Sequence, residues 1–188
     1  MKRDLTKPLT QGAKRTLAAF SNEMFALLSE KAFEDITVGE LCERARYPRA
    51  TFYNYFSDKY DLLDYCWITI ADNIGLSEYR YAPESRMLFL YFDRICSFTE
   101  ENADAISRIL RRNSEAGYMF SSLRNFMNRQ MRTLFQDCPD ALEKGVPTEL
   151  LADHYSNTIF LVWQWATANN RGCSPQQAQE YLRKLLLL

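Results

Sequence analysis

Apolar residues recur at steps of three and four along almost the whole chain, and this helical spacing is the feature that most constrains the fold. Leu17, Phe20, Met24 and Leu27 form one such stripe, which places all four side chains on one face of a helix. The 188 residues include only six glycines and six prolines, which are common turn formers. So few turn formers suit long helices better than the many turns of a β-sandwich. We therefore expect an all-α fold.

The apolar spacing and the capping signals predict about nine helices. Three short helices come first, then a connecting helix, and then five longer ones. They are expected at residues 11–30, 37–44, 49–56, 57–76, 84–101, 103–112, 116–135, 148–170 and 175–187. Thr37 and Glu40 form a capping box at the second helix. Ser57 is expected to cap the fourth helix, with the charge of Asp58 favourable near its positive end.

Composition excludes several classes of protein. A hydrophobic content of 47% is enough to bury a core, which argues against intrinsic disorder. The longest apolar runs, at residues 87–92 and 159–163, are far shorter than the ~20 residues of a membrane helix. The N-terminus also lacks the apolar segment of a signal peptide. We therefore expect a cytoplasmic protein without a membrane partner.

The residue types that usually bind metals or perform catalysis are sparse. The five cysteines include no C-x-x-C pair, so neither a zinc ribbon nor a disulfide framework is expected. His154 is the only histidine and cannot form a multi-histidine metal site. Glycine-rich nucleotide-binding motifs and the paired-histidine metalloprotease motif are absent from the sequence. We expect no metal, no cofactor and no enzymatic activity.

Residues 37–56 have the layout of a helix-turn-helix, with two short helices separated by a short break. Phe52 and Phe56 lie four positions apart and are expected to pack inward, which leaves polar and aromatic residues on the other faces. Among these residue types, Arg and Asn can form bidentate hydrogen bonds with base edges, and Tyr hydroxyls commonly bind phosphate. Between Arg44 and Ser57 the chain has three arginines and no acidic residue. From spacing alone, an ordinary α-hairpin scaffold remains an equal alternative to DNA binding.

The net charge of −1 conceals an uneven distribution. Residues 1–60 contain ten Lys or Arg and eight Asp or Glu, whereas residues 61–188 contain thirteen and sixteen. The first part therefore carries +2 and the rest −3, which agrees weakly with a nucleic-acid-binding N-terminal part.

The run ITVGELCERA at residues 36–45 is followed by TFYNYFSDKYDLL at residues 51–63. This pattern resembles the TetR/AcrR family of bacterial transcriptional regulators. The resemblance implies a helix-turn-helix DNA-binding domain in residues 1–57 and a larger helical ligand-binding and dimerisation domain in residues 58–188. It implies a sequence-specific regulator, typically a ligand-relieved repressor, that binds a pseudo-palindromic double-stranded DNA operator as a homodimer. The alternative is a co-regulator of the same fold that signals through a protein partner.

The residues expected to contact DNA follow from their chemistry and from this resemblance. They are Thr37, Arg46, Arg49, Ala50, Thr51, Tyr53, Asn54, Tyr55 and Lys59. The sequence departs from the family's pattern at three places. Ala32 stands where glycine is common, and Arg46 replaces the usual glycine of the turn. Tyr47 and Pro48 replace the common Val-Ser. We interpret the added arginine as an extra phosphate contact.

The middle helices carry many aromatic and thioether side chains. Such a set suits a flexible pocket for a small apolar or aromatic effector, although plain core is the alternative. The candidate pocket residues are Phe89, Phe92, Phe98, Tyr118, Phe126, Met127 and Trp163.

The last two predicted helices are apolar over more than one face. Such helices bury one face in their own core and another against a partner, unless they belong to a single thick core. We expect them to pair with their copies across a dimer. The candidate interface residues are Tyr155, Ile159, Val162, Trp163, Ala166, Leu182, Leu185 and Leu186.

Overall fold

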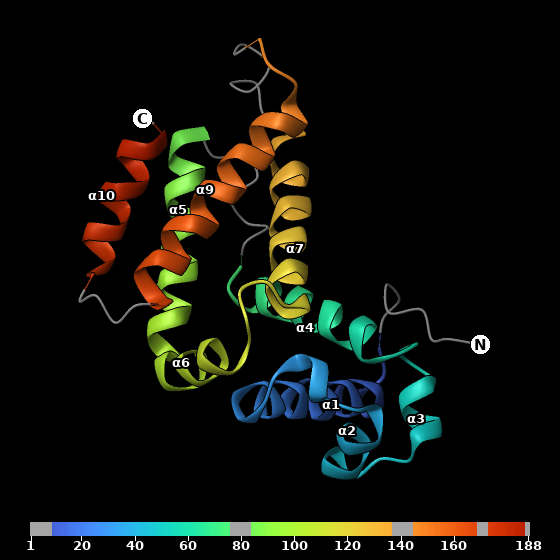
Figure 1. Ribbon diagram of the computed structural model, residues 1–188. Helices are drawn as coiled ribbons and strands as arrows, with labels where there is room; N and C mark the ends of the chain where they lie inside the picture. The colour runs from blue at the N-terminus through green and yellow to red at the C-terminus, as the bar shows by residue number, and fades with distance from the viewer. Residues whose placement is uncertain (1–8, 76–83, 137–144, 169–172, 187–188) are drawn as a thin grey trace. The chain divides into compact units, whose positions relative to one another are not determined.

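The computed structural model describes residues 9–75, 84–136, 145–168 and 173–186. Within these residues the protein has nine α-helices, one 3-10 turn and no strand (Figure 1). The elements are α1 (Gln11–Glu30), η1 (Phe33–Asp35), α2 (Val38–Ala45), α3 (Arg49–Tyr53), α4 (Lys59–Asn73), α5 (Glu84–Glu101), α6 (Ala103–Arg112), α7 (Tyr118–Phe135), α9 (Thr148–Ala168) and α10 (Pro175–Leu186). The prediction of an all-α fold with about nine helices is confirmed. The predicted helix ends at residues 76, 170 and 187 lie outside the described residues.

The start of α4 differs from the prediction. Asp58, and not Ser57, caps this helix: its Oδ1 accepts the N–H groups of Tyr60 and Asp61, each at 2.9 Å. Ser57 instead donates its backbone N–H to Asp61 Oδ2 at 2.8 Å. The prediction for Ser57 is therefore wrong. A carboxylate is the better cap here because it accepts two N–H groups and places a negative charge at the positive helix end.

The end of α3 also differs. The helix ends at Tyr53 and not at Phe56, because its last turn tightens. The N–H of Tyr55 donates to the carbonyl of Phe52 at 3.0 Å, which is the three-residue spacing of a 3-10 turn.

The chain divides into two compact units. The first contains the chain up to Thr69 together with Arg108–Ser121, and the second contains Ile70–Ser107 and the chain from Ser122 onward. The boundary expected between residues 57 and 58, which separates the DNA-binding domain from the ligand-binding and dimerisation domain, is defined by function and stays a prediction.

An aromatic cluster forms the core of the first unit. The rings of Phe20, Phe52 and Phe56 are fully buried, with centroids 5.3 Å apart for Phe20–Phe52 and 5.4 Å apart for Phe52–Phe56. The first of these pairs meets edge to face, which is a favourable aromatic geometry. This cluster fixes α3 against α1.

The second unit is built from longer helices. In it, α10 packs against both α9 and α5 (Figure 1). Trp163 on α9 donates its indole N–H to the hydroxyl of Thr99 on α5 at 2.9 Å. The rings of Phe135 on α7 and Tyr155 on α9 have centroids 5.3 Å apart.

Candidate nucleic-acid interface

The turn between α2 and α3 is closed by backbone hydrogen bonds. The N–H of Arg46 donates to Glu43 at 3.2 Å, and the N–H of Tyr47 donates to Cys42 at 3.0 Å. These two bonds form a Schellman motif, which ends a helix with a residue in the left-handed conformation. Arg46 is that residue, with φ 57° and ψ 39°. Pro48 then directs the chain into α3, where its fixed φ and missing N–H are tolerated.

The third helix buries one face and exposes the others. Phe52 is fully buried, whereas Arg49, Ala50, Tyr53 and Asn54 are exposed. The exposed fraction of Tyr53 is 51%. Thr51 is half-buried. A short helix with this arrangement offers hydrogen-bonding groups to the major groove without losing its anchor in the core.

Two of the predicted contact residues have additional local roles. The hydroxyl of Thr37 accepts the N–H of Glu40 at 3.2 Å and so caps α2, while its own proton remains available to a phosphate. Tyr55 is only 8% exposed, so most of its ring is part of the core in this conformation. The sequence pattern gave no signal that Tyr55 faces inward.

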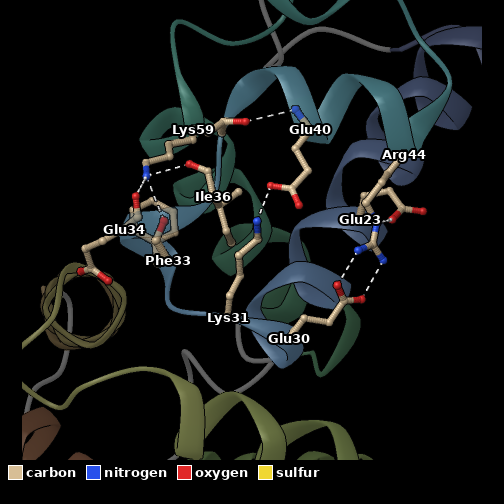
Figure 2. Close-up of polar contacts among 10 residues, drawn as sticks. Glu23, Glu30, Lys31, Phe33, Glu34, Ile36, Glu40, Arg44 and Lys59 are labelled. Carbon is tan, nitrogen blue, oxygen red and sulfur yellow. Dashed lines mark hydrogen bonds and ion pairs between the residues drawn. The ribbon is translucent and has the colours of Figure 1, made fainter.

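Lys59, which the sequence predicts to bind phosphate, is engaged within the chain. Its Nζ donates to the carbonyls of Phe33, Glu34 and Ile36 at 2.9, 2.7 and 2.9 Å (Figure 2). The ammonium also lies 4.7 Å from the centroid of the Phe33 ring. Partial burial lowers the pKa of the Lys59 amine, and the carboxylates of Glu34 and Asp35 oppose that shift. All three ammonium protons have acceptors in this conformation, so a phosphate would have to compete with them.

Gly39 permits an unexpected position of the Arg49 side chain. A Cβ added at Gly39 would lie 2.6 Å from Nη2 of Arg49, so the guanidinium lies directly over this part of α2. Burial raises the pKa of the Cys42 thiol, and the positive charge of Arg49 acts in the opposite direction. Only the glycine itself could have signalled this contact in the sequence.

The arginine-rich stretch is less positive than its sequence suggests. Arg44 donates its Nε to Glu23 at 2.9 Å, and its two terminal nitrogens bind Glu30 at 2.6 and 2.9 Å (Figure 2). These carboxylates raise the pKa of the Arg44 guanidinium, and Arg44 in turn lowers the pKa of Glu30. The charge of Arg44 is therefore largely satisfied by α1, which leaves Arg46 and Arg49 as the exposed cations of this stretch.

A polar junction joins η1 to the segment between α6 and α7 inside the first unit. The buried side chain of Asn113 accepts the N–H of Phe33 at 2.8 Å and donates to the carbonyl of Leu28 at 3.0 Å. Glu34 accepts the N–H of Tyr118, the first residue of α7, at 3.0 Å. No local sequence signal predicts this junction, because Asn113 and Leu28 lie 85 residues apart in the chain.

The candidate pocket residues are divided between the two units. Phe92, Phe126, Met127 and Trp163 are buried, and Phe89 and Phe98 are half-buried. Tyr118 belongs to the first unit, where its ring stacks on Phe33 with centroids 5.4 Å apart. That the other six line a pocket stays a prediction.

Most of the candidate interface residues are buried within their own chain. The two exceptions are Ala166, which is half-buried, and Leu185, which is 54% exposed. The buried residues are Tyr155, Ile159, Val162, Trp163, Leu182 and Leu186. Another set of apolar residues is exposed on the same two helices. It contains Leu150, Leu161 and Trp165 on α9, with Tyr181 and Leu185 on α10.

Two further structural observations concern metals and membranes. In the described ranges, no group of three or more His, Cys, Asp or Glu side chains could hold a metal ion. Of the helices in those ranges, none is long and apolar enough to cross a membrane.

Comparison with known proteins connects this geometry to a family. Residues 25–66 match the bacterial regulatory proteins of the tetR family. This match extends from the second half of α1 into α4 and so includes the whole helix-turn-helix. None of the curated proteins matches the chain.

Solved structures share the fold over nearly the whole chain. A TetR-family transcriptional regulator from Syntrophomonas wolfei, described as putative, is 17% identical with a TM-score of 0.63, over 92% of this chain and 94% of its own. The transcriptional regulator FadR from Bacillus subtilis, in complex with stearoyl-CoA, is 14% identical with a TM-score of 0.60, over 92% and 96%. The fatty acid degradation regulator FadR from Bacillus halodurans is 15% identical with a TM-score of 0.60, over 96% and 97%. Residues 25–66 of this chain thus match the model of the tetR family of bacterial regulatory proteins, and the described part of the chain shares its fold with TetR-family transcriptional regulators.

Proposed function

We propose that this protein is a sequence-specific DNA-binding regulator that acts as a homodimer and represses transcription until an effector releases it. The observation that carries the proposal is the division of α3 into a buried face at Phe52 and an exposed face with Arg49, Tyr53 and Asn54. These exposed side chains have the donors and acceptors that base edges and phosphates require.

The DNA experiment begins with selection of bound duplexes from a random-sequence library by the full chain. Arg49→Gln is expected to weaken binding to the selected duplex by about 5- to 100-fold, which is the usual range for loss of a bidentate arginine–base contact. Tyr53→Phe is expected to weaken binding to many sequences alike, because it removes a phosphate donor. Arg86→Gln, an exposed arginine on α5, is the charge-matched control. Failure to select any duplex would refute DNA binding, whereas equal affinity for all these variants would refute the role of the α3 side chains in it.

A homodimer is supported by the exposed apolar face of the last two helices. Leu161 and Trp165 on α9 lie one turn apart, as do Tyr181 and Leu185 on α10. Trp165 and Tyr181 meet edge to face with centroids 5.4 Å apart, so the two pairs form one surface. We place the dimer contact on this surface, which we call the α9–α10 face. A two-fold dimer would also present two α3 helices to two half-sites.

An effector site is supported by buried hydroxyl groups without partners. Tyr91 on α5 and Ser156 on α9 are at most 1% exposed, and neither hydroxyl has a hydrogen-bond partner among the described residues. Burial without a partner is unfavourable by about 1–3 kcal/mol per group, unless water or a ligand supplies the bond. The Bacillus subtilis regulator of similar fold was solved with stearoyl-CoA, whose acyl chain is apolar. We propose that the effector has an apolar body and a polar group that supplies the missing hydrogen bond to one of these hydroxyls.

The effector is tested with acyl-CoA and with free CoA as the control. Stearoyl-CoA is expected to raise the melting temperature of the protein and to release the selected duplex, whereas CoA alone should do neither. Tyr91→Phe is expected to weaken that response and to leave DNA binding without ligand unchanged. If no acyl-CoA releases the duplex but a protein captured with the DNA-bound chain changes its DNA binding, the co-regulator alternative replaces this part of the proposal.

A further inference from the structure

Arg46 is the only non-glycine residue with a positive φ in the part of the chain that the structure describes. At the other two described positions with a positive φ, the chain has Gly75 and Gly145. The left-handed conformation crowds a Cβ against the backbone, so a residue other than glycine is strained there. Strained residues of this kind are held in place by the structure around them, and they cluster at functional sites.

The turn itself does not require an arginine. Its closing bonds are made by the backbone N–H groups of Arg46 and Tyr47, which a glycine at position 46 would leave in place. The ring of Tyr47 packs on Phe20 with centroids 5.6 Å apart, which fixes the far side of the turn. The strain at Arg46 is therefore not a condition for forming the turn.

The Arg46 side chain also has no polar partner within the described part of its own chain. It is exposed, and no hydrogen bond or ion pair of its guanidinium is found among the described residues. The neighbouring cations differ in this respect: Arg44 is paired with Glu23 and Glu30, and Lys31 with Glu40 at 2.6 Å (Figure 2). The turn thus holds a cation without an anion among the residues that the structure describes, on a backbone fixed from both sides.

We infer that Arg46 binds a DNA phosphate, and that the chain tolerates a strained turn in order to hold this guanidinium at the edge of the major groove. The inference rests on the proposed DNA-binding function. Arg46 precedes α3, the helix expected to enter the groove, and in that docking geometry a residue before the recognition helix lies nearer to the sugar-phosphate backbone than to the base edges. A guanidinium on a fixed backbone also loses less conformational entropy on binding than one on a flexible loop.

The inference predicts that one substitution has opposite effects on stability and on DNA binding. In the full chain, Arg46→Gly should raise the melting temperature by about 2–4 °C, because glycine relieves the strain. The same change should weaken binding to a duplex selected by the wild-type chain by about tenfold, and should lower the slope of log K against log salt by about 1. A mixed-sequence 40-base-pair duplex at low salt should show the same loss, because a phosphate contact does not depend on sequence.

Two further variants separate charge from backbone conformation. Arg46→Asn keeps a residue that tolerates the left-handed region but removes the charge, so it should lose the same affinity as Arg46→Gly. Arg46→Lys should keep most of the affinity and the full salt slope. Arg86→Gln removes one exposed positive charge from α5 and measures any long-range effect of net charge.

The outcomes distinguish this inference from the proposed function. If the wild-type chain binds DNA and Arg46→Gly binds it equally well, or no worse than Arg86→Gln, the phosphate contact is wrong and DNA binding stands. If Arg46→Gly lowers the melting temperature, the strained-turn argument is wrong. If the wild-type chain binds neither duplex, both the inference and the proposed function fail.

Discussion

Single residues of the helix-turn-helix are constrained by what lies beside them and not only by what they are expected to contact. Gly39 lies in the first turn of α2, where glycine is normally unfavourable by up to about 1 kcal/mol relative to alanine. Its lack of a Cβ leaves room for the Arg49 guanidinium. We interpret Gly39 as the residue that lets Arg49 rest against α2 in a defined orientation before it meets a base.

Gly39→Ala should therefore improve stability and impair DNA recognition. Alanine favours the helix, but its Cβ would lie 2.6 Å from Arg49 Nη2, so the flexible guanidinium must move away. We expect a higher melting temperature together with weaker discrimination at the base that Arg49 reads, measured by competition between selected and single-mismatch duplexes. Gly12→Ala is the matched control, since no atom lies within 4 Å of its added Cβ. Equal discrimination by both variants would show that the position of Arg49 over Gly39 has no role.

At the scale of elements, η1 connects several helices of the first unit. Lys59, at the start of α4, binds three carbonyls of the segment from Phe33 to Ile36. Asn113, which follows α6, binds the N–H of Phe33 and the carbonyl of Leu28 near the end of α1. Because these bonds replace water at partly buried backbone groups, we expect them to determine how the α6–α7 connection and α4 are held relative to the helix-turn-helix.

Lys59→Gln should destabilise the protein whether or not DNA is present. The variant loses charge-assisted bonds to three carbonyls, and we expect the free energy of unfolding to fall by about 2 kcal/mol in urea denaturation. Lys14→Gln, at an exposed lysine of α1, should change the free energy of unfolding by less than about 0.5 kcal/mol. If Lys59→Gln unfolds like the wild type and loses only DNA affinity, Lys59 is a phosphate-binding residue first and the carbonyl contacts are incidental.

Asn113→Ala should be among the more damaging polar substitutions in the first unit. Its side chain is 5% exposed, and its removal leaves the N–H of Phe33 and the carbonyl of Leu28 without their partner. We expect a loss of about 2–3 kcal/mol in urea denaturation. Asn102→Ala removes an exposed bond at the end of α5, from the amide to the carbonyl of Phe98, and should cost far less. Comparable losses for both variants would contradict the importance of the junction.

Asn113→Asp tests the same junction through pH. One carboxyl oxygen would face the carbonyls of Leu28 and Ile109, which now accept from the amide at 3.0 and 2.9 Å. Two facing acceptors favour the protonated acid, so its pKa should rise above the unfolded value of about 4. The stability of the variant relative to the wild type is then greatest below about pH 4 and falls as the pH rises through the folded pKa. A variant whose stability does not depend on pH relative to the wild type would contradict this geometry.

At the scale of the whole chain, the sequence predicted the fold well because the apolar period and the caps are local signals. The helix-turn-helix followed from the same local signals, with Phe52 inside and Arg49, Tyr53 and Asn54 outside. The details of α3 and α4 were less predictable. Asp58 and Ser57 are both good caps, and only the backbone geometry selects between them.

Long-range packing gives some of the expected site residues contacts that local sequence signals do not predict. Tyr55 and Lys59 have the chemistry of phosphate contacts, yet a ring buried in the core and a set of carbonyls from η1 engage them within the chain. Likewise, the sequence places α9 apolar residues on two faces but does not tell which face meets the chain's own core. Ile159 and Val162 are on the buried face, and Leu161 is on the exposed one.

The α9–α10 face gives the whole-molecule prediction. Leu161→Glu with Leu185→Glu places charges at positions that are 57% and 54% exposed, so each chain should fold normally while the dimer is lost. Light scattering after size exclusion should show a monomer, and affinity for a two-half-site duplex should fall at least tenfold because the half-sites then bind independently. Ile68→Glu, at a 47% exposed position on α4, should leave the dimer intact. A double variant that stays dimeric, or a monomeric wild type, would move the interface elsewhere or remove it.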